Sequence, residues 1–295
     1  MVEVAGIRPG DRLFFYVQRT KQIMGGYEAV TRPFFDQNPL FKGATHINER
    51  FPFRVGFKQV VDFAKPIHIN DIWASRDQGQ IWTMQQARGD AIGRHACWGL
   101  TRQESIILWR MLQELNIIAP LVEDRHNKLP ASLQPLPINT SIGGTLNHPC
   151  LVYEHALQAL LLEDLGDGYH TELFGNYEDF LPSVPTSSGK EMDIVLLAYD
   201  NQHKVLWYQI LELKKDRFRW EDLKQLLDYE VWLTSGQAEG NPRAVHMAAV
   251  ANRFDNDVID HLRRRKEAGQ KEVRLIRYRY NGLCAPRLTL EQIVV

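Results

Sequence analysis

Hydrophobic and polar positions follow different patterns in the two halves of the chain. In the first half, Thr101 followed three positions later by Glu104 predicts a helix start, and apolar positions keep helical spacing up to residue 116. Aromatic and β-branched runs broken by turn residues predict strands at 11–18, 26–35 and 51–63. This half is therefore predicted to be mostly β with a helical end.

The periodicity fades over residues 121–149, which carry four prolines and a Gly-Gly pair and have the composition of a linker. Beyond it, helical patterns alternate with apolar runs, which is typical of an α/β layer fold. We predict a domain at 1–120, a linker at 121–148 and a second domain at 149–295. The second domain is expected to have helices at 149–166, 220–234 and 255–268, a hairpin within 189–216, and strands at 243–251 and 272–280.

Composition narrows the class of protein without deciding its function. The 295 residues are 44% hydrophobic and 24% charged, which is ordinary for a globular chain, and the net charge is −1. Any nucleic-acid binding must therefore come from local patches. The three cysteines lack CxxC spacing, which favours a reducing compartment, and no apolar run approaches the length of a membrane span. We expect a cytoplasmic protein without a signal peptide.

Candidate chemistry lies in the predicted hairpin GKEMDIVLLAYDNQHKVLWYQILELKKD. Asp193 begins its first strand, and Glu212 and Lys214 are two apart in the second, so their side chains leave the same face. Two carboxylates that converge in a buried place repel each other, and a hard cation such as Mg²⁺ relieves this repulsion. A lysine beside them can orient or deprotonate a water, or stabilise charge on a phosphate. The pattern therefore indicates a metal-dependent phosphodiesterase.

Asp193, followed one hairpin later by Glu212-Leu213-Lys214, resembles the D…(D/E)xK signature of the PD-(D/E)xK nucleases. Over about residues 150–280 the chain looks like the nuclease domain of NucS/EndoMS-type archaeal endonucleases. The resemblance implies an αβββαβ core with a mixed sheet, of the restriction-endonuclease type, and Mg²⁺ (or Mn²⁺) held by Asp193, Glu212 and the carbonyl of Leu213. It also makes Glu154 and Gln225 candidate catalytic residues, with Tyr229 one turn after Gln225.

Each of these residues also has a plainer interpretation. Glu212 and Lys214 can form a solvent-side pair on an edge strand, and Asp193 can cap a strand start. Glu154 can be a solvated helix residue, and Gln225 and Tyr229 can be ordinary helix packing. The run of basic residues after the motif suits a phosphate track, although such a run is usually a solvated face.

The first domain resembles the EVE and related PUA-like domains, small β-barrels close to the YTH readers of methylated adenine. The resemblance rests on the Gly-Asp turn before an aromatic strand, an Arg-Val strand and a Pro-Ile step. It implies a pocket in which aromatic rings stack on a modified or flipped base. The candidate rings are Trp73, Trp82, Trp98 and Tyr16, and a polar loop with Arg88, Gly89, Arg94 and His95 lies among them; core packing is the alternative for each ring.

The sequence as a whole predicts a two-domain endonuclease that acts on DNA, as in modification-dependent restriction or repair, and that works as a homodimer. Two alternatives stay open at this point. The chain can be a nucleic-acid-binding module that does not cut, or an RNA-processing nuclease. No nucleophile elbow, P-loop or GxGxxG motif points to another enzyme class.

Overall fold

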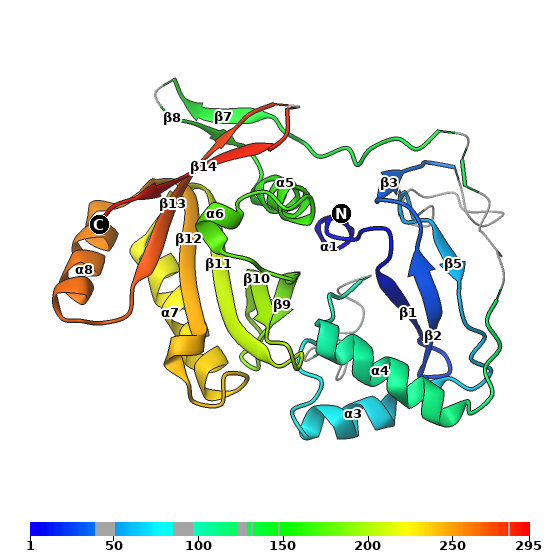
Figure 1. Cartoon of the computed structure of the whole chain (residues 1–295). Coiled ribbons are helices and arrows are strands. Elements are labelled where there is room, and N and C mark those ends of the chain that lie inside the picture. Colours follow the sequence, from blue (N-terminus) through cyan, green and yellow to red (C-terminus); the bar gives the residue numbers. More distant parts are fainter. Residues whose placement is uncertain (39–50, 85–96, 123–128, 131, 147, 283) are drawn as a thin grey trace. The chain divides into compact units, whose positions relative to one another are not determined.

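The computed structural model describes residues 1–38, 51–84, 97–122, 129–130, 132–146, 148–282 and 284–295 (Figure 1). These residues form two compact units. The first contains Glu3–Met84 and Leu100–Pro137, and the second contains residues 97–99 and Ile138–Val295. Both units mix helices with sheets. No helix in the described part of the chain is long and apolar enough to cross a membrane.

The first unit is built on a small antiparallel sheet. Strand β2 (Gln22–Ala29) lies at its centre and pairs with β1 (Arg12–Val17), β5 (Phe57–Gln59) and β6 (Ile67–His68). A separate pair joins β3 (Phe34–Phe35) to β4 (Phe53–Arg54), so the predicted strand at 26–35 is two strands. The helices are α1 (Val2–Ala5), α3 (Ile69–Asp77) and α4 (Arg102–Leu115). A closed barrel stays a prediction.

Helix α4 begins where the capping box predicts. The carboxylate of Glu104 is fully buried and accepts four hydrogen bonds, from the backbone nitrogens of Trp82, Thr83 and Thr101 at 2.6–2.8 Å and from Thr83 Oγ1 at 2.8 Å. The side chain therefore caps its own helix and also holds the segment around Thr83.

We expect Glu104→Gln to lower the free energy of unfolding by about 1–3 kcal/mol. The side-chain NH₂ group of the introduced glutamine would face backbone and hydroxyl groups that are themselves donors, so hydrogen bonds are lost. Urea unfolding at neutral pH measures the loss. The matched control is Glu114→Gln on the exposed side of the same helix, and an equal effect of both substitutions would contradict the role given to Glu104.

The second unit is a six-stranded mixed sheet with helices packed on it. The strand order is β14-β13-β12-β11-β10-β9, in which β11, β12 and β13 run parallel and the other neighbours run antiparallel. The strands are β9 (Asp179–Pro185), β10 (Glu191–Tyr199), β11 (Val205–Phe218), β12 (Val245–Phe254), β13 (Val273–Tyr280) and β14 (Leu288–Ile293). The helices are α5 (Glu154–Gly166), α6 (Thr171–Phe174), α7 (Trp220–Ser235), the 3₁₀ turn η3 (Pro242–Ala244) and α8 (Asn256–Glu267).

The order α5, β9–β11, α7, β12 is the predicted order of one helix, three strands, one helix and one strand. The predicted hairpin is present, since β10 and β11 pair antiparallel around a turn at residues 200–204. Residues 194–198 and 208–213 of these strands are all buried. Burial on both faces explains the nearly continuous apolar runs in the sequence.

The start of this unit differs from the prediction in the position of its first helix. The predicted linker ends in a hairpin of β7 (Ile142–Thr145) and β8 (His148–Leu151), and the helix expected from residue 149 begins only at Glu154. That helix is also buried along most of its length. The hydroxyl of Tyr278 joins the hairpin to the sheet, because it accepts from Leu151 N and donates to the carbonyl of Lys215.

Candidate active site

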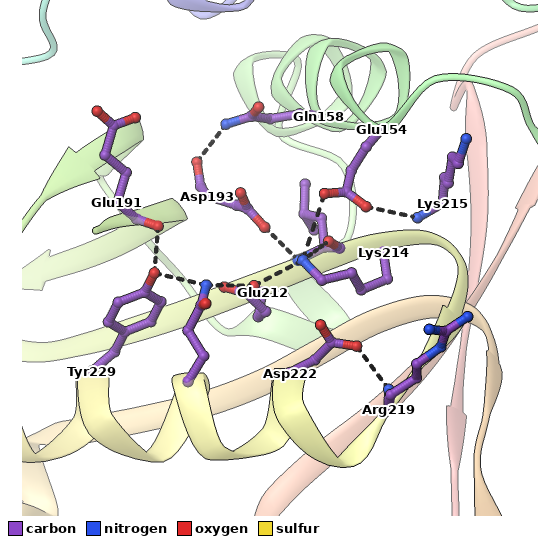
Figure 2. Close-up of polar contacts among 12 residues, drawn as sticks. Glu154, Gln158, Glu191, Asp193, Glu212, Lys214, Lys215, Arg219, Asp222 and Tyr229 are labelled. Carbon is purple, nitrogen blue, oxygen red and sulfur yellow. Dashed lines mark hydrogen bonds and ion pairs between the residues drawn. The ribbon is translucent and has the colours of Figure 1, made fainter. Parts of the chain in front are cut away.

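The candidate site lies where two central strands separate. The pairing of β10 with β11 runs from the turn to Ile194 opposite Leu211 and goes no further. Asp193 is the next residue of β10, and its Oδ2 accepts a hydrogen bond from Leu213 N at 2.7 Å. The end of the ladder therefore brings Asp193 beside the Glu212-Leu213-Lys214 segment. Figure 2 shows α5 on one side of these strands and α7 on the other.

Glu212 is the most deeply buried acid of the site, with 1% of its side chain exposed. Its Oε1 accepts from Lys214 Nζ at 2.9 Å and from Gln225 Nε2 at 3.1 Å. Its Oε2 is buried and has no hydrogen-bond partner among the residues that the structure describes. A buried carboxylate oxygen without a partner is costly, so this atom is suited to a cation.

Lys214 connects two of the acids of the site, Glu212 and Glu154. Besides Glu212, its ammonium group donates to the carbonyl of Leu213 at 2.9 Å and lies 3.5 Å from Glu154 Oε1. Glu154 is the first residue of α5, where a negative charge is favoured by the helix dipole. Its other oxygen accepts from Lys215 N at 3.3 Å. The structure thus brings Asp193, Glu154, Glu212 and Lys214 into one cluster.

Helix α7 supplies the other side of the site. Gln225 and Tyr229 are one turn apart, and Gln225 Nε2 donates both to Glu212 and to Tyr229 Oη, the latter at 2.8 Å. Tyr229 Oη donates in turn to the carbonyl of Glu191 at 2.7 Å. A continuous set of hydrogen bonds therefore runs from β10 through α7 to the buried acid on β11, and it fixes the position of Glu212.

Burial and charge shift the pKa values of all three central groups. Burial raises the pKa of Asp193 to about 6 and, with the added charge of Asp193, raises the pKa of Glu212 to about 8. Burial lowers the pKa of Lys214, but the carboxylates of Glu212, Asp193 and Glu154 outweigh burial and leave that pKa raised. The lysine is thus a lasting cation, whereas the two buried acids repel each other when both are ionised.

This repulsion predicts a dependence of stability on pH. Because the folded chain binds protons more tightly than the unfolded chain at Asp193 and Glu212, these two groups destabilise the folded state increasingly as pH rises from about 4 to about 8. In EDTA, wild type should lose at least about 1 kcal/mol between pH 5 and pH 8 relative to Glu212→Gln. Urea unfolding of both proteins at the two pH values measures the difference, and parallel profiles would contradict the prediction.

The site offers few but suitable ligands for a metal ion. No group of three or more His, Cys, Asp or Glu side chains within the described ranges is arranged to hold a metal. Asp193, Glu212 and the Leu213 carbonyl make a sparser set of oxygen ligands. Such a set suits Mg²⁺, which takes one or two carboxylates and keeps several waters. The partnerless Glu212 Oε2 is the feature that fits a cation, so the residues present are compatible with Mg²⁺.

Two of the predicted base-binding rings lie on separate elements, and the other two lie outside the helices and strands. Tyr16 is on β1, and Trp73 is on α3 with the Arg76 guanidinium 5.7 Å from its ring centre. Trp82 is 5% exposed and belongs to the core of the first unit, whereas Trp98 is partly buried and falls in the second. A pocket shared by these rings stays a prediction, and Arg88, Gly89, Arg94 and His95 lie outside the described residues.

Gln158 is the residue of this site that the sequence analysis missed. Its Nε2 donates to the carbonyl oxygen of Asp193 at 2.6 Å (Figure 2). The signal that could have found it is its spacing, since Gln158 follows Glu154 by one helical turn and so shares its face. A glutamine on a helix is usually a surface residue, so composition alone gave no reason to select it.

Comparisons with known proteins give little further information. No protein-family model matches the chain, and no curated protein matches it. Two solved structures are similar over 54% of this chain and 72% of their own, a complex of EndoMS with double-stranded DNA (TM-score 0.30, 16% identity) and EndoMS in the apo form (TM-score 0.25, 18% identity). Similarity at this level carries no argument about activity, which must come from the geometry of the site.

Proposed function

We propose that the second unit is a Mg²⁺-dependent endonuclease that hydrolyses phosphodiester bonds of DNA. The observation that carries the proposal is the buried carboxylate of Glu212, with one oxygen unpartnered, beside Asp193 and Lys214. A structural ion pair needs one acid for one lysine. Here two acids, Glu212 and Glu154, contact one ammonium group, and a third, Asp193, is bound to the backbone between Glu212 and Lys214, which is an arrangement that suits a divalent cation and a phosphate.

In this proposal Asp193, Glu212 and the Leu213 carbonyl hold Mg²⁺, and Mn²⁺ can replace it. The metal supplies positive charge that neutralises the phosphate and favours deprotonated water. Lys214 orients the attacking water and stabilises the charge that develops on the phosphate. Its position is fixed by Glu154 Oε1 at 3.5 Å, and Gln225 fixes Glu212 through the hydrogen bond at 3.1 Å. Both are positioning residues in this assignment.

The first unit is proposed to recognise a modified or flipped base through one or more of its rings Tyr16, Trp73 and Trp82. Stacking on aromatic rings suits every base, because each base has a π face. A modification reader joined to a nuclease suits modification-dependent restriction or repair. Cleavage of both strands of a duplex requires two active sites, which a homodimer supplies.

The test is cleavage by the purified wild-type protein of four labelled substrates, namely unmodified DNA duplex, base-modified DNA duplex, single-stranded DNA and RNA, each with Mg²⁺, Mn²⁺ or EDTA. Metal-dependent cutting of a DNA duplex supports the proposal, and faster cutting of modified duplex supports the role of the first unit. Cutting of RNA alone would make the chain an RNA-processing nuclease. Binding without cutting in any metal would make it a nucleic-acid-binding module.

A further inference from the structure

The contact between α5 and β10 lies at the point where the sheet opens. Asp193 is one residue beyond the last paired position of β10 and β11, so the ladder that fixes residues 194–199 does not extend to it. Two contacts from outside the ladder hold it instead. Leu213 N donates to its carboxylate at 2.7 Å, and Gln158 Nε2 donates to its carbonyl at 2.6 Å.

These two contacts act on different parts of the residue. The Leu213 contact orients the carboxylate once the backbone is in place, while the Gln158 contact places the backbone itself. On the other side of Asp193, strand β9 contains Pro182 and Pro185, which have no backbone N–H to donate, and Ser183 between them has a positive φ of 50°. Strand β9 pairs with Met192 and Ile194 but skips Asp193, so the backbone at Asp193 itself is supported by α5 and not by a ladder pair of its own.

The first turns of α5 hold both separated strands. Glu154 accepts from Lys215 N of β11 and lies beside Lys214 Nζ, and Gln158, one turn later, donates to Asp193 of β10. The spacing of four residues puts both side chains on one helix face. The helix therefore sets the distance between the strands at the position where their two acids must converge.

We propose that Gln158 is a positioning residue of the metal site, which holds the main chain of Asp193 so that its carboxylate and that of Glu212 reach the same cation. This inference rests on the proposed function. Groups that orient metal ligands from outside the ligand set contribute about 10–100-fold to metal affinity when they are removed one at a time. Gln158 acts through Asp193 and need not touch the substrate.

The experiment compares wild type with Gln158→Met, which keeps the length of the side chain and removes the donor, and with Gln158→Glu, which turns an acceptor toward the carbonyl. Gln202→Met, in the exposed turn between β10 and β11, is the matched control. Mn²⁺ affinity is measured by calorimetry without nucleic acid. Cleavage rate is measured as a function of Mg²⁺ concentration, and the melting temperature in EDTA reports on folding.

We expect Gln158→Met to weaken Mn²⁺ binding by about tenfold or more and to raise the half-saturating Mg²⁺ concentration by a similar factor. The rate at saturating Mg²⁺ should change by less than about threefold, because the metal itself restores the geometry at high occupancy. Gln158→Glu should weaken binding at least as much, and Gln202→Met should match wild type.

Unchanged Mn²⁺ affinity in both Gln158 variants, with or without a lower melting temperature, would overturn the inference and leave Gln158 a purely structural contact. If wild type itself neither binds Mn²⁺ nor cuts, the proposed function fails and this inference fails with it. If wild type cuts DNA and the Gln158 variants show normal metal dependence, only the positioning role of Gln158 is contradicted, and the proposed function stands.

Discussion

Replacing Lys214 by methionine is expected to slow cleavage of a DNA duplex by at least about 10³-fold. The substitution removes the ammonium group that contacts Glu212, the Leu213 carbonyl and Glu154. Among the described residues, no other ammonium group contacts all three. A methionine of similar length can neither orient a water nor stabilise a charged phosphate. Gel assays at saturating Mg²⁺ measure the loss.

Loss of the ammonium group also leaves a buried carboxylate without its counter-ion, so the variant can be less stable as well as inactive. Melting temperatures with Mg²⁺ separate the two effects, because the metal replaces part of the missing charge. Lys204→Met, at the exposed end of the hairpin turn, is the matched control and should cut normally. A folded Lys214→Met protein with more than a tenth of wild-type activity would contradict the role of Lys214.

Asp193→Asn is expected to abolish cleavage to a similar degree and to weaken Mn²⁺ binding by at least about tenfold. The amide oxygen can still accept from Leu213 N, so the local hydrogen bond is kept while the charge is lost. Because the charge of Asp193 raises the pKa of Glu212, its removal should also relieve repulsion and leave the protein in EDTA at pH 8 as stable as wild type, or more so.

Calorimetry with Mn²⁺ and urea unfolding at pH 8 measure these two effects. Asp228→Asn is the matched control, because Asp228 is 73% exposed on α7. An Asp193→Asn protein that binds Mn²⁺ as tightly as wild type would show that the metal site does not include Asp193. A large loss of stability instead would make Asp193 a structural residue.

The central hairpin and its acids could be predicted because their sequence signals are strong. The runs before Asp200 and after Lys204 are almost continuously apolar, so the charged positions Asp193, Glu212 and Lys214 stand out against them. The start of helix α4 could be predicted for the same reason, since a capping box is a local signal that needs no tertiary context.

The parts that were missed lack such local signals. Strand β9 contains Pro182 and Pro185, so the hydrophobic pattern did not locate it, although the resemblance implied a third strand. It lies at the edge of the sheet, where proline is tolerated because no neighbour needs its N–H. The β7–β8 hairpin contains a Gly-Gly pair and Pro149 and so resembled a linker. It is held by contacts with residues far along the chain, such as Tyr278. The role of Gln158 depends in the same way on tertiary placement alone.

The most direct test of the account is the conversion of supercoiled plasmid by purified wild type and by Glu212→Gln, each with Mg²⁺ and with EDTA. Glu267→Gln, exposed on α8, serves as the matched control. We predict nicked or linear product only with Mg²⁺, and only from wild type and the control. Equal cutting by Glu212→Gln, cutting in EDTA, or no cutting by wild type would contradict a metal-dependent nuclease at this site.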